Sequence, residues 1–117
     1  MTQRHVKLGL VQSSVGPDKS ANLAKTAKLV ADAAARGAKL ICLQELFASE
    51  YFCQREDAAL FDLAEPLPGP TTEAMAAVAK QHGVSIVTPV FERRAAGVYH
   101  NSLVVIGPKG DITGLYR

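Results

Sequence analysis

Short apolar runs alternate with helical periodicity along the first part of the chain. Residues 6–11 and 40–43 are mostly apolar and are bounded by polar or turn residues, as expected of buried strands. Between them, apolar residues recur at spacings of four, three and four, namely Leu23, Ala27, Val30 and Ala34. This spacing predicts an amphipathic helix that starts at Pro17 or Ser20 and ends at Arg36-Gly37.

Residues 58–64 predict a short helix, and a longer helix is expected further along the chain. The three prolines within residues 65–70 exclude a helix or a central strand there. The next helix is expected to be capped by Thr71 or Thr72 and to end at Gly83. Its predicted inner stripe consists of Met75, Val78, Ala79 and His82.

Three further strands are expected at residues 84–90, 98–106 and 112–116. Pro89 is expected to stop or bend the first of them, and Arg93-Arg94 is interpreted as a solvated turn. The last two strands form a predicted antiparallel hairpin. The order βαβαβββ predicts an α/β fold with a mixed sheet, in which the first two strands are parallel with a right-handed crossover.

The five predicted strands have helices for only one sheet face, so the other face is expected to be open. We therefore expect residues 1–117 to be the amino-terminal portion of a single larger domain. The alternative is that Arg117 is a natural end and that a partner chain covers the sheet.

Composition narrows the functional class. An apolar fraction of 48% and a charged fraction of 21% are typical of a globular protein. The net charge is +2 with both signs mixed along the chain, so we expect no nucleic-acid partner and no polybasic membrane anchor. No apolar stretch approaches the roughly 18 residues of a membrane span. The two cysteines form no disulfide framework, and a cytoplasmic protein is the default expectation.

Glu45 is the first candidate for chemistry. It follows the apolar run at residues 40–43 almost directly, and open α/β sheets place ligand crevices at the carboxyl ends of their strands. Three aromatic residues follow within seven positions and could wall such a crevice: Phe47, Tyr51 and Phe52. The alternative is a glutamate that caps a turn or pairs with an arginine.

Other polar residues give weaker signals. Cys53 lies eight residues after Glu45 and could in principle act as a nucleophile. This role is disfavoured, because no basic residue before Arg55 would activate its thiol. The three histidines share no spacing typical of metal ligands, so no metal site is expected. Asn101 lies in a polar cluster at the head of an apolar strand, where it either holds a loop or reaches a site; we favour the loop.

The chain resembles the nitrilase superfamily of carbon–nitrogen hydrolases. The resemblance extends from about residue 6 to residue 117 and depends on several segments: Gln12, Leu43-Gln44-Glu45-Leu46-Phe47 with Tyr51, Pro68-Gly69-Pro70, Tyr99-His100-Asn101-Ser102 and Gly114-Leu115-Tyr116-Arg117. Within the superfamily, Tyr51-Phe52-Cys53-Gln54 and Phe91-Glu92-Arg93 look most like N-carbamoylputrescine amidohydrolases.

The resemblance implies a Glu–Lys–Cys catalytic set, in which Glu45 matches the general base. The lysine would follow Arg117 and the nucleophilic cysteine would lie further on. Tyr51 matches a residue near the pocket mouth, Phe47 is expected to line the pocket, and Glu50 and Glu92 are candidates for binding a cationic diamine tail.

The expected reaction is hydrolysis of N-carbamoylputrescine, a small carbamoyl amine, through a Cys-bound intermediate and without metal or cofactor. The resemblance also implies the amino-terminal part of a four-layer α-β-β-α sandwich and a homo-oligomer. The alternatives are another amidase of the superfamily, such as a β-ureidopropionase, an ω-amidase or a nitrilase, or a non-catalytic fragment. A flavodoxin-like binding domain is disfavoured, because the predicted hairpin breaks the alternating parallel order.

Overall fold

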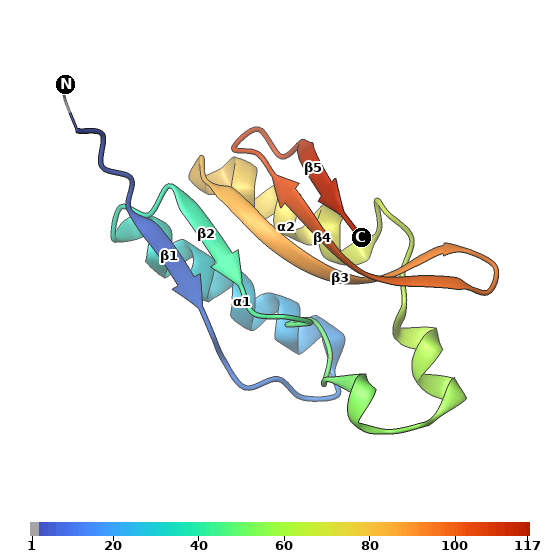
Figure 1. Ribbon diagram of the computed structural model, residues 1–117. Helices are drawn as coiled ribbons and strands as arrows, with labels where there is room; N and C mark the ends of the chain where they lie inside the picture. Colours follow the sequence, from blue (N-terminus) through green and yellow to red (C-terminus); the bar gives the residue numbers. More distant parts are fainter. Residues whose placement is uncertain (1–2) are drawn as a thin grey trace.

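The computed structural model describes residues 3–117, which form one five-stranded sheet with both α-helices on the same face (Figure 1). The elements in chain order are β1 (Leu8–Val11), α1 (Lys19–Ala35), β2 (Leu40–Leu43), α2 (Pro70–His82), β3 (Ser85–Ala95), β4 (Val98–Ile106) and β5 (Ile112–Tyr116). Two short 3-10 helices, Phe52–Gln54 and Ala58–Leu63, lie between β2 and α2.

The strands lie in the sheet in the order in which they occur along the chain. The β1–β2 and β2–β3 pairs are parallel, whereas the β3–β4 and β4–β5 pairs are antiparallel. This arrangement confirms the predicted α/β fold with a mixed sheet. It also places the carboxyl ends of β2, β3 and β5 toward the same edge of the sheet, because these three strands run in one direction.

Strand β3 is longer than predicted. It continues through Pro89, which is opposite Leu103 in the register with β4, and ends only at Ala95. Pairing with β2 stops at Val87, so at Pro89 this edge of β3 has no ladder partner that needs an amide N–H. The edge is used again further on, where the Arg93 amide donates to the Glu65 carbonyl oxygen at 2.9 Å. Our interpretation of Arg93-Arg94 as a turn is therefore wrong, since both residues belong to β3.

Helix α1 begins at Lys19, between the two predicted starts Pro17 and Ser20. The Asp18 carboxylate caps it by accepting from the amides of Ser20 and Ala21, at 2.9 and 3.2 Å. Its most buried positions are Asn22, Thr26 and Val30, so the inner face is rotated from the predicted stripe. The predicted end is confirmed, with Gly37 in a left-handed conformation at φ 93°.

Helix α2 begins at Pro70, with Gly69 as its N-cap. Thr71 and Thr72, which we expected to cap the helix, lie inside its first turn and are buried. The Thr72 hydroxyl accepts from the Gly69 amide at 2.9 Å. The buried Glu65 carboxylate accepts from the amide of Thr71 at 2.7 Å, which places a negative charge at the helix N-terminus.

The main core lies between the helices and the sheet, and the opposite sheet face is open. Ile41, Ile86 and Val104 are fully buried on the helix side. On the other side Leu10 is 83% exposed and Tyr116 is 76% exposed, with no described residue above them. The expectation of one open sheet face holds for residues 3–117, and the four-layer arrangement stays a prediction.

Replacing Gly69 with Ala is expected to destabilise the N-terminus of α2. A Cβ at this position would lie 2.4 Å from the carbonyl oxygen of Pro66, so the backbone must shift. We expect the free energy of unfolding to fall by about 1–3 kcal/mol, as for other overpacked sites.

The matched control is Gly16→Ala, because a Cβ at Gly16 would meet no heavy atom within 4 Å. Urea unfolding of the native polypeptide that contains this chain measures both changes. Equal unfolding midpoints for the two variants would contradict the prediction.

Candidate active site at the carboxyl end of β2

A cleft of about 310 Å³ lies where β2, β3, β4 and β5 come together. Glu45 lines it just after the end of β2, and Tyr116 lines it at the end of β5. The cleft is also lined by Leu43, Pro89, Asn101, Ser102 and Leu103. The structure thus places the first candidate residue in a concave site at the carboxyl end of a strand, as expected for α/β sheets.

The backbone after β2 turns sharply at Glu45. Leu46 adopts a left-handed conformation with φ 53°, which costs a non-glycine residue about 1–3 kcal/mol. Its side chain is 3% exposed and packs against Ala64 and Phe91. Because burial of Leu46 holds this turn, the side chain of Glu45 leaves the line of β2 and reaches the cleft.

Two amides tie the turn to neighbouring segments. The Gln44 side chain accepts from the Ser13 amide at 2.5 Å and donates to the Ser13 carbonyl oxygen at 2.7 Å. The buried Asn22 side chain on α1 donates to the carbonyl oxygens of Gly16 and Ala48, at 2.7 and 3.1 Å. Asn22 was not among the predicted site residues; the available signal was its position at helical spacing from Thr26 and Val30.

Asn101 contacts the candidate base directly. It lies in β4 opposite Phe91 in β3, and its Nδ2 donates to Glu45 Oε1 at 2.6 Å. Our favoured interpretation, that Asn101 holds a loop, is therefore wrong. The residue lies in a strand and its side chain reaches the candidate site.

Tyr51 lies close to Glu45 in a neighbouring hollow. A hydrogen bond with Cys53 raises the pKa of the Tyr51 hydroxyl, and the charges of Cys53 and Glu45 act in the same direction. The hollow is about 580 Å³ in volume and is also lined by Glu50 and Phe52. Tyr51 is 45% exposed, so its side chain is accessible at the position expected for a pocket mouth.

Phe47 and Phe52 differ from the expectation that both wall the cleft. Phe47 is 2% exposed and belongs to the main core between helices and sheet. Phe52 stacks on Phe91 with a ring-centroid distance of 4.0 Å. Both rings are thus used for packing, because the chain reverses at Leu46 and directs them away from Glu45.

Glu92 also differs from its expected role. Its carboxylate is 1% exposed and accepts from Arg117 Nε and Nη2 at 2.9 and 2.8 Å, and from the Ser102 hydroxyl at 2.5 Å. The hydrogen bonds from Arg117 lower the pKa of Glu92, against the opposing effect of desolvation. Since Arg117 already neutralises this carboxylate, Glu92 is not a free receptor for a cationic substrate.

The Glu92–Arg117 ion pair holds the end of β5 beside the cleft. Tyr116 is opposite Leu103 in the register of β4 and β5 and lines the cleft on the open sheet face. Arg117, the next residue, reaches Glu92. The end of β5 is therefore held next to Glu45, in the cleft that Tyr116 and Glu45 share.

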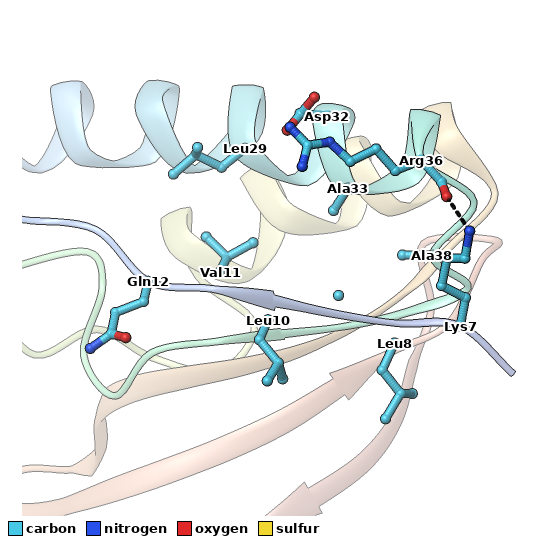
Figure 2. Close-up of a pocket in the computed structure, with 11 residues that line it drawn as sticks. Lys7, Leu8, Leu10, Val11, Gln12, Leu29, Asp32, Ala33, Arg36 and Ala38 are labelled. Carbon is cyan, nitrogen blue, oxygen red and sulfur yellow. Dashed lines mark hydrogen bonds and ion pairs between the residues drawn. The ribbon is translucent and has the colours of Figure 1, made fainter.

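Another hollow, of about 370 Å³, lies between β1 and α1 (Figure 2). Its three charged residues interact with one another: Lys7 donates to the Arg36 carbonyl oxygen at 2.8 Å, and Arg36 pairs with Asp32. The labelled side chains that lie between the strand and the helix are otherwise largely aliphatic, among them Val11, Leu29 and Ala33. We therefore place the candidate chemistry at Glu45.

Within residues 3–117, no group of three or more His, Cys, Asp or Glu residues is arranged to hold a metal ion. In the same part of the chain, neither α-helix has the length and apolar character needed to cross a bilayer.

Comparison with known proteins gives a consistent result. The model of the carbon–nitrogen hydrolase family matches residues 7–117. An N-carbamoylputrescine amidase of Solanum lycopersicum is 39% identical over 97% of this chain, which covers 38% of that relative. An omega-amidase of Xenopus laevis is 35% identical over 95% of the chain, which covers 39% of that relative.

A crystal structure gives the same match in three dimensions. The carbon–nitrogen hydrolase from Helicobacter pylori G27 superposes with a TM-score of 0.90 and 34% sequence identity. The alignment covers 96% of this chain and 39% of the other. The chain thus spans less than half the length of the relatives that it matches.

Proposed function

The chain belongs to the carbon–nitrogen hydrolase family, and on this premise we propose that the native polypeptide hydrolyses a linear amide or ureido bond. The supporting observation is the position of Glu45. Its carboxylate lies in a cleft, accepts a hydrogen bond from Asn101, and shares that cleft with the end of β5. In this proposal Glu45 is the general base, and a lysine and a cysteine that follow Arg117 complete the catalytic set.

The proposed reaction has two stages. Glu45 takes the proton of the cysteine thiol as sulfur attacks the substrate carbonyl carbon, and the lysine stabilises the oxyanion. The carbon–nitrogen bond then breaks, and the leaving amine takes the proton from Glu45. In the second stage Glu45 activates a water that attacks the thioester carbon and releases the cysteine. For a ureido substrate the resulting carbamic acid loses carbon dioxide, which frees the second amine.

We further propose N-carbamoylputrescine as the preferred substrate, which places the protein in polyamine biosynthesis. The similarity to an N-carbamoylputrescine amidase supports this assignment, whereas the similarity to an omega-amidase supports an alternative amide substrate. The reacting group would lie at Glu45. The cationic tail would extend past Tyr51 into the hollow lined by Glu50.

Replacing Glu50 with Gln is expected to raise KM for N-carbamoylputrescine roughly fivefold, because an exposed ion pair contributes up to about 1 kcal/mol. The KM for an uncharged amide of similar length should be unchanged. Glu56→Gln, at an exposed carboxylate in the same loop, is the matched control. Equal KM values for the Glu50 variant and the control would exclude Glu50 from tail binding.

Two measurements test the proposed function itself. The intact mass of the native protein is expected to lie well above the 12.4 kDa of this chain. Ammonia release is then measured with N-carbamoylputrescine, an ω-amide, a ureido acid and a nitrile. Fastest turnover of N-carbamoylputrescine supports the assignment, and fastest turnover of another compound reassigns the substrate. A mass equal to this chain, or no turnover of any compound, would overturn the proposed function.

A further inference from the structure

The hydrogen bond between Asn101 and Glu45 joins two parts of the chain that are 56 residues apart. The Nδ2–Oε1 distance is 2.6 Å, and both residues line the cleft at the carboxyl end of β2. An ionised carboxylate accepts hydrogen bonds only, so the group that Asn101 presents must be its NH₂. Within residues 3–117 the Glu45 carboxylate accepts no other hydrogen bond from a side chain.

We propose that Asn101 is the positioning residue for Glu45, an inference that rests on the proposed hydrolase function. Its amide holds Oε1 and leaves Oε2 as the oxygen that exchanges protons with the nucleophile and the hydrolytic water. Glu45 is exposed and joined to the sheet only through a turn, so its side chain would otherwise sample several rotamers. Holding one rotamer keeps the base in reach of the reacting atoms.

An amide is chemically suited to this task. It donates a hydrogen bond without a full charge, so it orients the carboxylate without forming the ion pair that would make Glu45 a weaker base. An asparagine also neither takes up nor releases a proton near neutral pH. The proton that Glu45 collects in each stage therefore stays on Glu45 until the leaving group or the nucleophile takes it.

Both ends of this hydrogen bond have rigid supports. On one side, Asn101 lies in β4 next to Ser102, which is buried and donates to Glu92 at 2.5 Å. On the other side, the turn that carries Glu45 is held by Asn22, which donates to the Ala48 carbonyl oxygen. The amide and the carboxylate thus meet as parts of two fixed segments, as a preorganised site requires.

The test is a set of variants in the native polypeptide: Asn101→Ala, Asn101→Asp, and Asn101→Ala combined with Glu45→Gln. Asn101→Ala is expected to lower kcat roughly 10- to 100-fold, the scale of a misplaced catalytic group, with KM changed less than about threefold. The melting temperature should stay the same because Asn101 is exposed. Asn101→Asp places a second carboxylate beside Glu45, so the acidic limb of the pH–rate profile should move to higher pH.

The double variant separates positioning from a direct role in substrate binding. If Asn101 acts only through Glu45, its loss costs nothing further once Glu45 is Gln, and the two effects are not additive. If the wild-type enzyme is active and Asn101→Ala keeps kcat within about twofold of it, the inference is overturned. Full additivity of the two effects in the double variant would also overturn it. An inactive wild type would instead overturn the proposed function, so the two failures are distinguishable.

Discussion

Replacing Glu45 with Gln in the native polypeptide is expected to lower kcat roughly 10²- to 10⁴-fold, the usual contribution of a general base. Gln has the shape of Glu, and its carbonyl oxygen can still accept the hydrogen bond that Asn101 donates to position 45. The substitution therefore removes the basic oxygen and keeps the local geometry. Because Glu45 is exposed, the melting temperature should be unchanged.

Steady-state ammonia release from the substrate measures this effect, with Glu56→Gln as the matched control. Glu56 is an exposed carboxylate 11 residues further along the chain, and no described side chain pairs with it. The control is expected to keep wild-type kcat. A Glu45→Gln variant with kcat within about tenfold of wild type would contradict the assignment of Glu45 as the base.

Replacing Arg117 with Met is expected to have the largest effect on stability. The change leaves the Glu92 carboxylate, which is 1% exposed, without its cationic partner. Breaking a buried pair in this way typically costs about 3–5 kcal/mol. We expect about 3 kcal/mol, the lower end of that range, because the Arg117 side chain is 32% exposed and water can partly replace it.

The surface pair Arg36–Asp32 provides the control. Its side chains are 77% and 56% exposed, so Arg36→Met should cost only about 0.3–0.5 kcal/mol in urea unfolding. Replacing Glu92 and Arg117 together with Met should recover at least half of the loss, since no unpaired charge then remains buried. If Arg117→Met and Arg36→Met lower the free energy of unfolding equally, the Glu92–Arg117 pair stabilises the fold no more than a surface pair does.

The same ion pair predicts a dependence on pH. The ordinary pKa of Glu92 is 4.5, and the hydrogen bonds from Arg117 lower this pKa in the folded protein. The stabilisation is therefore fully present above pH 4.5 and is lost as the pH falls below that value toward the folded pKa. The stability difference between wild type and Arg117→Met should narrow over the same acidic range.

The regular elements could be predicted because their signals are local. The apolar run 40–43 is β2, and the predicted ranges 98–106 and 112–116 are β4 and β5. Gly37 and Gly83 end their helices in left-handed conformations, as a helix followed by glycine predicts. The prediction of the first strand failed only at its start, where β1 begins at Leu8.

Other predictions failed where distant partners decide the outcome. Pro89 predicts the end of a strand, but β2 stops short of it and β4 pairs alongside it, so β3 continues. Phe47 follows the candidate base in sequence, yet the left-handed turn at Leu46 directs it into the core. The position of the turn depends on the packing of Leu46, which involves residues far along the chain.

The sequence by itself determined the fold class, the family resemblance and the candidacy of Glu45, because periodicity, turn residues and the motif around residues 43–47 are properties of short segments. Only the tertiary structure decided which side chains meet. It brought Asn101 to Glu45, paired Glu92 with Arg117, and removed Phe47 and Glu92 from the substrate-binding candidates. The physical reason is that each contact reaches across an intervening strand, β3 for the Asn101–Glu45 hydrogen bond and β4 for the Arg117–Glu92 pair. Such contacts depend on how the whole sheet assembles, and local sequence patterns do not specify them.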